Sequence, residues 1–201
     1  SKDSRFMTMN CSEYANNPEM LMTNLFGYKK GSYTGAEKDT QGLLALADGG
    51  ILFMDEVHGL KPECQEKIFL FMDKGIYHMV GDNDTWYVSN ARLIFATTEQ
   101  PDEVLLKTLL RRIPLIVKVP SLAERPLQEK RELLQFLIQE EEKHIQRKIS
   151  MSDLVFRTLE RHTFTGNIGE LKNVIRASVA KAFLRNQKDM DDVSLHIYDL
   201  S

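Results

Sequence analysis

The sequence predicts an α/β domain built on a parallel sheet, followed by a small all-helical domain. Two apolar runs, Ile51–Met54 and Leu93–Ala96, suit strands that are buried on both faces, as strands of parallel sheets are. Polar side chains follow both runs, and ligands of open α/β sheets bind at that end of the strands. From Pro126 onward only helical patterns remain. We therefore expect an α/β core over residues 1–122 and a helical domain over residues 123–201.

Local residue patterns predict the individual elements. Pro62 suits the first position of a helix, and Ile68 and Phe71 would share one face of it. Ser152 and Asp153 suit the start of a helix in the second domain. Strands are expected at 5–10, 51–56, 92–98 and 115–119, helices at 18–26, 62–74, 127–148, 152–162 and 167–186, a helical turn at 42–47 and a turn at 81–84.

Composition excludes several classes of protein. The chain has 201 residues, a formal net charge of −3 and a pI of about 6.0. This balance argues against the chain gripping DNA by itself, because phosphate contacts need clustered Lys and Arg. No apolar run approaches the roughly 20 residues that a membrane helix needs, and the N-terminus lacks the core of a signal peptide. Cys11 and Cys64 show no metal-type spacing, so we expect buried thiols in a reduced, cytoplasmic setting.

Asp55 and Glu56 are the strongest candidates for catalytic chemistry. They end an apolar strand, which is the form of a Walker B motif. In such a site Asp55 would hold Mg²⁺, and Glu56 would orient and polarise the water that attacks ATP. The alternative is a pair of solvated acids at a strand end. His58 is interpreted as a surface histidine, with an indirect role beside Glu56 as the alternative.

Two further positions could serve nucleotide chemistry. Thr98 ends the next strand and could meet the γ-phosphate or the attacking water, unless its hydroxyl simply caps a turn. Arg111 precedes the last expected strand. In a ring assembly it could reach a neighbour's phosphate, and otherwise it would be a solvated base.

The segment Gly31-Ser32-Tyr33-Thr34-Gly35-Ala36 combines glycines with one aromatic side chain. Such a composition is typical of a mobile loop that presents a side chain to a partner. Taken alone, it could equally be an ordinary surface turn.

The ordered set of motifs resembles the central AAA+ ATPase domain of bacterial enhancer-binding proteins, which activate sigma-54 RNA polymerase. That family carries Asn-Cys, then Leu-Phe-Gly-x-x-x-Gly-Ala-Phe-Thr-Gly-Ala, Gly-Gly-Thr-Leu-Phe-Leu-Asp-Glu, Ala-Thr-Asn, Pro-Pro-Leu-Arg-Glu-Arg and Trp-Pro-Gly-Asn-Val-Arg-Glu-Leu. The corresponding segments here are Asn10–Cys11, Leu25–Ala36, Gly49–Glu56, Ala96–Thr98, Pro120–Arg125 and Phe164–Leu171. The likeness covers nearly the whole chain in the same order, and the hexapeptide at 31–36 is its most specific part.

The resemblance implies roles for these positions. Gly31, Ser32, Tyr33, Thr34, Gly35 and Ala36 would form the loop that contacts sigma-54. Asp55 and Glu56 would be the Walker B pair for ATP and Mg²⁺, and Asn10 would restrain Glu56. Thr98 would be sensor I, in contact with nucleotide, and Arg111 a trans-acting arginine. The implied partners are sigma-54 RNA polymerase and further copies in a hexameric ring, with promoter or enhancer DNA bound through other domains.

Several positions depart from the family pattern. Tyr33 replaces Phe, Thr98 replaces Asn, and Leu105, with Lys107 close by, stands at the first trans-arginine position. Gly169 stands at the sensor II arginine position, so coupling of the lid to nucleotide must differ or be supplied by another residue. The pattern is similar to the branch that regulates levan and mannose-type sugar uptake operons and carries phosphotransferase-system regulation domains.

No Walker A motif, Gly-x-x-x-x-Gly-Lys-Ser/Thr, occurs in the 201 residues. A phosphate loop works through backbone N–H groups next to a lysine. In the family this loop and its strand precede the strand that ends at Asn10. We therefore expect a sheet that is incomplete on the N-terminal side, a chain that starts after the Walker A motif, and no tight ATP binding or hydrolysis by these residues alone.

Three functional hypotheses remain open at this point. The first is an ATP-driven transcription activator. The second is a non-hydrolysing module that binds sigma-54 or self-associates. The third is another AAA+ machine, such as a helicase loader or an unfoldase, and the hexapeptide argues against it.

Overall fold

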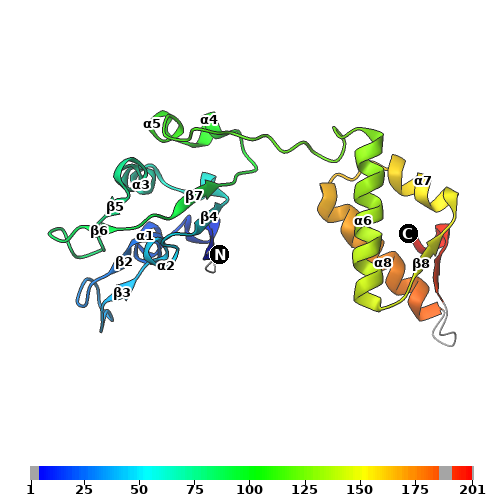
Figure 1. The fold of residues 1–201 in the computed structure, drawn as a ribbon, viewed down its shortest axis with the longest axis horizontal. Coiled ribbons are helices and arrows are strands. Elements are labelled where there is room, and N and C mark those ends of the chain that lie inside the picture. The colour runs from blue at the N-terminus through cyan, green and yellow to red at the C-terminus, as the bar shows by residue number, and fades with distance from the viewer. Residues whose placement is uncertain (1–4, 186–191, 201) are drawn as a thin grey trace. The chain divides into compact units, whose positions relative to one another are not determined.

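The computed structural model describes residues 5–185 and 192–200, which form two compact units, residues 1–116 and 117–201. The first unit is built on a parallel sheet of β1 (Phe6–Asn10), β4 (Ile51–Asp55) and β7 (Arg92–Phe95), in the order β1-β4-β7 (Figure 1). The α/β class and these three strands are confirmed. Asn10 lies directly opposite Asp55, so both side chains stand at the carboxyl ends of neighbouring strands.

Helices connect the strands where the sequence predicts them. Helix α1 (Pro18–Phe26) begins with the side chain of Asn17 accepting a hydrogen bond from the Met20 amide at 3.0 Å. Helix α3 (Pro62–Lys74) ends at Gly75, which has a φ of 69°. Both ends follow general rules: an Asn cap with Pro in the first turn, and Gly in the left-handed region after the last turn.

The core of the first unit lies against one face of the sheet. Met9, Leu52 and Met54 are buried there, and the apolar faces of α1 and α3 pack in the same cluster. Cys11 and Cys64 are free, buried thiols, as expected, and burial raises the pKa of Cys11 to about 12. The shorter elements of the unit are α2 (Leu43–Leu46), α4 (Pro101–Val104), α5 (Lys107–Leu110) and the 3-10 turns η1 (Cys11–Tyr14) and η2 (Val57–Gly59).

The expected strand at 115–119 was wrong for this structure. The segment forms no ladder, and Leu115 and Val119 are 74% and 73% exposed. Apolar and β-branched residues favour an extended chain, but a strand also needs a partner for its backbone groups. Within the described residues the sheet ends at β7, so residues 115–119 have no neighbouring strand.

The first unit also contains two hairpins that the sequence did not predict. One pairs β2 (Gly27–Tyr28) with β3 (Thr40–Gln41) and carries the hexapeptide, and the other pairs β5 (Ile76–Tyr77) with β6 (Tyr87–Val88) around the predicted turn. Gly27 has a φ of 78°, and a Cβ there would lie 2.4 Å from the Thr40 carbonyl oxygen, so only glycine fits. The Val80 amide donates to the Gly27 carbonyl at 2.8 Å, which joins the two hairpins at their bases.

The second unit is the expected helical domain. Its helices are α6 (Leu127–Ile145), α7 (Asp153–Arg161) and α8 (Asn167–Arg185), with a final 3-10 turn η3 (Ile197–Leu200). The Ser152 side chain caps α7 as predicted. The unit also contains a parallel pair of short strands, β8 (Ile149–Met151) and β9 (Val193–Leu195). Their sequence carries little strand signal because each strand is only three residues long.

Three buried carboxylates tie the second unit together. Arg131 of α6 pairs with Glu160 of α7, Arg176 of α8 pairs with Glu141 of α6, and Arg185 of α8 pairs with Asp199. Removing the arginine of such a pair leaves a buried charge without a counter-ion, which costs far more than breaking a surface pair.

Candidate functional site

The predicted site residues gather at the carboxyl edge of the sheet. Asn10 ends β1, Asp55 ends β4, and Thr97 and Thr98 follow β7. Because the three strands are parallel, these ends lie side by side. The Asp55 carboxylate accepts a hydrogen bond from the Glu56 amide at 3.0 Å through Oδ1, which fixes its orientation.

Glu56 has an unusual backbone and a crowded carboxylate. Its φ and ψ are 50° and 48°, a left-handed conformation that costs a non-glycine residue about 1–2 kcal/mol. Its Oε2 accepts from the Thr98 hydroxyl at 3.2 Å and lies 3.1 Å from His58 Nδ1. Strain of this kind persists where the surrounding structure holds a side chain in place, often at a functional site.

Asn10 is not brought to Glu56. Its Oδ1 accepts from the Ser12 amide at 3.0 Å and so caps η1. The restraint of Glu56 by Asn10, implied by the family resemblance, therefore stays a prediction. The Glu56 carboxylate is instead in contact with two other residues, His58 and Thr98.

The donor set at this edge suits Mg²⁺. Carboxylate oxygens are the ligands that this ion prefers, and Asp55 is half-buried at the strand end. Among the described residues no cluster of three His, Cys, Asp or Glu side chains could hold a metal. One carboxylate together with water molecules is a common set of ligands for Mg²⁺ in proteins.

The two neighbouring arginines differ in their surroundings. Arg112 binds both oxygens of Asp73, with Nε–Oδ1 and Nη2–Oδ2 distances of 2.8 Å, and also donates to the Thr108 carbonyl. Arg111 caps the end of α5 and is exposed. Arg112 thus holds α5 to α3, whereas the Arg111 side chain stays exposed.

The hexapeptide loop closes on itself. The Gly31 amide donates to the Ala36 carbonyl at 2.8 Å, and the Ala36 amide donates to the Tyr33 carbonyl at 3.1 Å. Ala36 is buried, whereas Tyr33 is 47% exposed and meets Tyr28 edge-on at 5.1 Å between ring centroids. The hydrogen bond between the Tyr28 and Tyr33 phenols raises the pKa of Tyr33. The aromatic side chain is therefore displayed and held at the same time.

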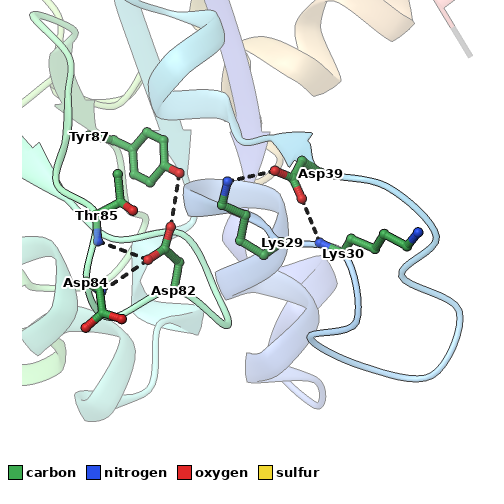
Figure 2. A network of polar contacts seen from close by, with 7 residues as sticks. All are labelled: Lys29, Lys30, Asp39, Asp82, Asp84, Thr85 and Tyr87. Atoms are coloured by element: carbon green, nitrogen blue, oxygen red, sulfur yellow. Dashed lines mark hydrogen bonds and ion pairs between the residues drawn. The ribbon is translucent and has the colours of Figure 1, made fainter.

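Asp39 joins the two chain segments at the neck of this loop, which consists of Lys29, Lys30 and Asp39 (Figure 2). Its Oδ2 binds Lys29 Nζ at 2.7 Å, and its Oδ1 accepts from the Lys30 amide at 2.8 Å. The Lys29 ammonium, and next the Lys30 amide, lower the pKa of Asp39. The second hairpin has a similar knot, in which Asp82 accepts from the Thr85 amide at 2.9 Å and from the Tyr87 hydroxyl at 3.1 Å.

The two hairpin turns touch at Ser32 and Gly81. A Cβ on Gly81 would lie 2.6 Å from Ser32 Cβ, so the turns are in close contact. The Ser32 hydroxyl is buried by this contact and has no hydrogen-bond partner. An unpaired buried hydroxyl costs free energy, so the loop is docked at an energetic disadvantage at this position.

A cavity of about 570 Å³ separates the carboxylate edge from the neck of the loop. Asn10 and Asp55 line one part of it, and Tyr28 and Thr40 of the hairpin line another. The candidate catalytic edge and the base of the hexapeptide loop therefore border a common space.

Comparison with known sequences decides the family. The sequence model of the Sigma-54 interaction domain matches residues 1–119, and that of an AAA+ ATPase lid domain matches residues 128–198. The chain belongs to the sigma-54 interaction domain family. Among the described residues no helix is long and apolar enough to cross a membrane.

Curated relatives of this sigma-54 interaction domain are transcriptional regulators. The transcriptional regulatory protein LevR of Bacillus subtilis is 45% identical over 97% of the chain, and DagR of Salmonella typhimurium is 39% identical over 91% of it. The chain spans only about a fifth (21% and 20%) of these relatives' lengths. A Nif-specific regulatory protein of Azotobacter vinelandii is 33% identical over 86% of the chain and is covered over 34% of its own length.

Solved structures confirm the AAA+ fold. The crystal structure of NtrX from Brucella abortus in complex with ADP has a TM-score of 0.77 and 23% sequence identity, over 99% of this chain and 43% of NtrX. The sigma-54 interaction domain and its lid therefore have the expected architecture.

The sequence predicted two features of the site only in part. The second hairpin was expected only as a turn at 81–84, because its strands are two residues long. His58 was interpreted as a surface histidine, and an indirect role beside Glu56, two residues away, was the alternative. Its contact with the carboxylate follows from the tight turn η2, which no sequence pattern indicates.

Proposed function

We propose that the chain is the motor of a transcriptional activator, which uses ATP hydrolysis to move the hexapeptide loop against sigma-54 RNA polymerase. The observation that carries this proposal is the Glu56 carboxylate, held beside Thr98 at the edge that also bears Asp55. The 201 residues contain no Walker A motif. The activity is therefore proposed for a protein that supplies a phosphate loop in addition to these residues.

Each residue of the edge has a defined task in this proposal. Mg²⁺ would neutralise charge that develops on the phosphates. Asp55 would hold that ion, and Glu56 would orient the attacking water and accept its proton. Thr98 would respond to the γ-phosphate through its hydroxyl, because that hydroxyl also donates to the Glu56 carboxylate. Arg111 would act on the phosphates bound by a neighbouring copy in a ring.

The loop would be the working contact with sigma-54. Tyr33 supplies an exposed aromatic surface, and Thr34 an exposed hydroxyl beside it. Gly31 and Gly35 have φ values of 80° and 103°, and nothing lies within 4 Å of where their Cβ atoms would be. These glycines permit a turn that L side chains disfavour, without being packed in place.

The wider setting of the chain is also part of the proposal. We expect a hexameric ring, DNA contact through other domains, regulation by phosphotransferase-system domains, and a cytoplasmic location. The similarity to LevR and DagR, which are named as transcriptional regulatory proteins, supports a role in transcription control.

Two variants test the motor and the loop separately. In a protein that carries this chain and a phosphate loop, Asp55→Ala should abolish Mg²⁺-dependent ATP hydrolysis, because the ion loses its carboxylate. Thr34→Ala should retain hydrolysis and lose binding of purified sigma-54 in the presence of a transition-state phosphate analogue.

The control is Thr163→Ala, an exposed threonine of the lid, which should change neither quantity. Sigma-54 binding that is indifferent to nucleotide would instead support a non-hydrolysing module. Hydrolysis that survives Asp55→Ala would contradict the proposed motor.

A further inference from the structure

We infer that His58 is a positioning residue for Glu56: its Nδ1–H holds the carboxylate at Thr98, in the orientation that the reaction uses. This inference rests on the proposed function. The Glu56 and His58 side chains are 27% and 30% exposed, so the contact is partly shielded from water. Partial burial makes a charge-assisted hydrogen bond stronger than it would be at the open surface.

The hydroxyls of Thr97 and Thr98 lie beside the contact between His58 Nδ1 and Glu56 Oε2. Nδ1 lies 3.1 Å from Oε2 and 3.3 Å from Thr97 Oγ1, and the Thr98 hydroxyl lies 3.2 Å from Oε2. The imidazole of η2 therefore lies against Oε2, and the Thr98 hydroxyl, from the segment after β7, donates to the same oxygen. A free glutamate side chain would sample several rotamers, and these two contacts select one of them.

The chemistry of the groups fixes the histidine tautomer. An ionised carboxylate only accepts hydrogen bonds, so Nδ1 must carry a proton to bind Oε2. Thr97 Oγ1 also accepts from the Glu99 amide at 3.1 Å, which keeps it near Nδ1 as a second acceptor. The Nδ1–H tautomer is thus the form that this environment favours, whichever state Nε2 adopts.

Backbone contacts on both sides of His58 fix the position from which its side chain extends. The amide of Val57, which is fully buried, donates to the Ala96 carbonyl at 3.0 Å. A Cβ on Gly59 would lie 3.0 Å from the Ser12 backbone, so η2 packs closely on η1. His58 therefore lies between two residues whose backbone is closely packed, which limits the movement of its side chain against Glu56.

A matched pair of variants separates positioning from mere bulk. The amide nitrogen of Asn can occupy the place of Nδ1, whereas that of Gln reaches the place of Nε2. In a protein that carries this chain and a phosphate loop, His58→Ala and His58→Gln should lower kcat for ATP at least about tenfold, with KM changed less than about twofold. His58→Asn should keep kcat within about threefold of the wild type.

A spectroscopic measurement checks the same contact without turnover. Solid-state ¹⁵N NMR of histidine-labelled protein, with the His58 signal assigned by its loss in His58→Asn, should show the Nδ1–H tautomer. Glu56→Gln should shift that signal, because the carboxylate acceptor is gone.

The outcomes distinguish this inference from the proposed function. An unprotonated Nδ1, a wild-type kcat in His58→Ala, or equal activity in His58→Gln and His58→Asn would overturn the role of His58. If the wild-type protein shows no ATP hydrolysis at all, the proposed motor fails, and the tautomer measurement still decides whether His58 holds Glu56.

Discussion

Single residues carry the strain and the unpaired groups of this molecule. Glu56 is one of three described non-glycine residues with positive φ, together with Gln146 and Asn167. Gln146 caps the end of α6, where a left-handed residue is usual. Glu56 has no such structural explanation, and its carboxylate is in contact with Thr98 and His58. Strain and placement therefore coincide at the residue that the proposed reaction needs.

Ser32 offers a test at the same scale. Replacing Ser32 with Ala should raise the free energy of unfolding by about 1 kcal/mol, because the variant removes a buried hydroxyl that has no partner. Denaturant unfolding would measure the difference. Ser12→Ala, at an exposed position, should change it by less than about 0.5 kcal/mol. A clear loss of stability in Ser32→Ala would show that the hydroxyl is satisfied in solution.

At the scale of elements, the hexapeptide loop depends on its neck. Asp39 connects both chain segments of the hairpin base through Lys29 and Lys30. The second hairpin is bound to this base through Val80 and to the loop through Gly81. A movement of either hairpin must therefore break or carry along contacts made by the other.

The ion pair at the neck predicts a pH dependence. The pKa of Asp39 is lower in the folded state than the unfolded value of about 3.9. Its contribution to stability is therefore complete above about pH 4 and is lost as the pH falls through the folded-state pKa. The ¹³C shift of the Asp39 carboxyl, followed against pH, should titrate below 3.9, and Lys29→Met should move the midpoint upward. Lys61→Met, at an exposed lysine, should leave it unchanged. A midpoint that ignores Lys29→Met would mean that the pair does not form.

At the scale of the whole molecule, the described residues form two hydrophobic cores, one in each unit. One contains Leu21 and the other Leu134, each 1% exposed, and they belong to residues 1–116 and 117–201 respectively. Each core packs its own helices, so each unit has its own source of stability.

Two core substitutions should therefore act independently. Leu21→Ala should destabilise only the first unit, and Leu134→Ala only the second, each by about 2–5 kcal/mol. Differential scanning calorimetry should show two transitions, with one lowered in each variant. A single transition that both substitutions lower equally would mean that the units unfold together.

How far the sequence predicts the site depends on the range of the interactions. The placement of Asp55, Glu56 and Thr98 at strand ends was predicted because apolar strands that end in polar residues form a local pattern. The contact of His58 with Glu56 was only the alternative interpretation, because it depends on a left-handed turn and on the neighbouring strand β7. Likewise, residues 115–119 have the composition of a strand and yet do not form one.

The sequence by itself determined the family, the parallel strands β1, β4 and β7, the long helices and the hexapeptide. These follow from hydrophobic period, from Pro and Gly at helix ends, and from motifs in order, all of which are properties of short segments. Only the tertiary structure decided which donors hold Glu56, that Asn10 caps η1, and that Ser32 is buried against Gly81. Those contacts join segments that are far apart in the chain, and their geometry depends on how the strands and turns pack.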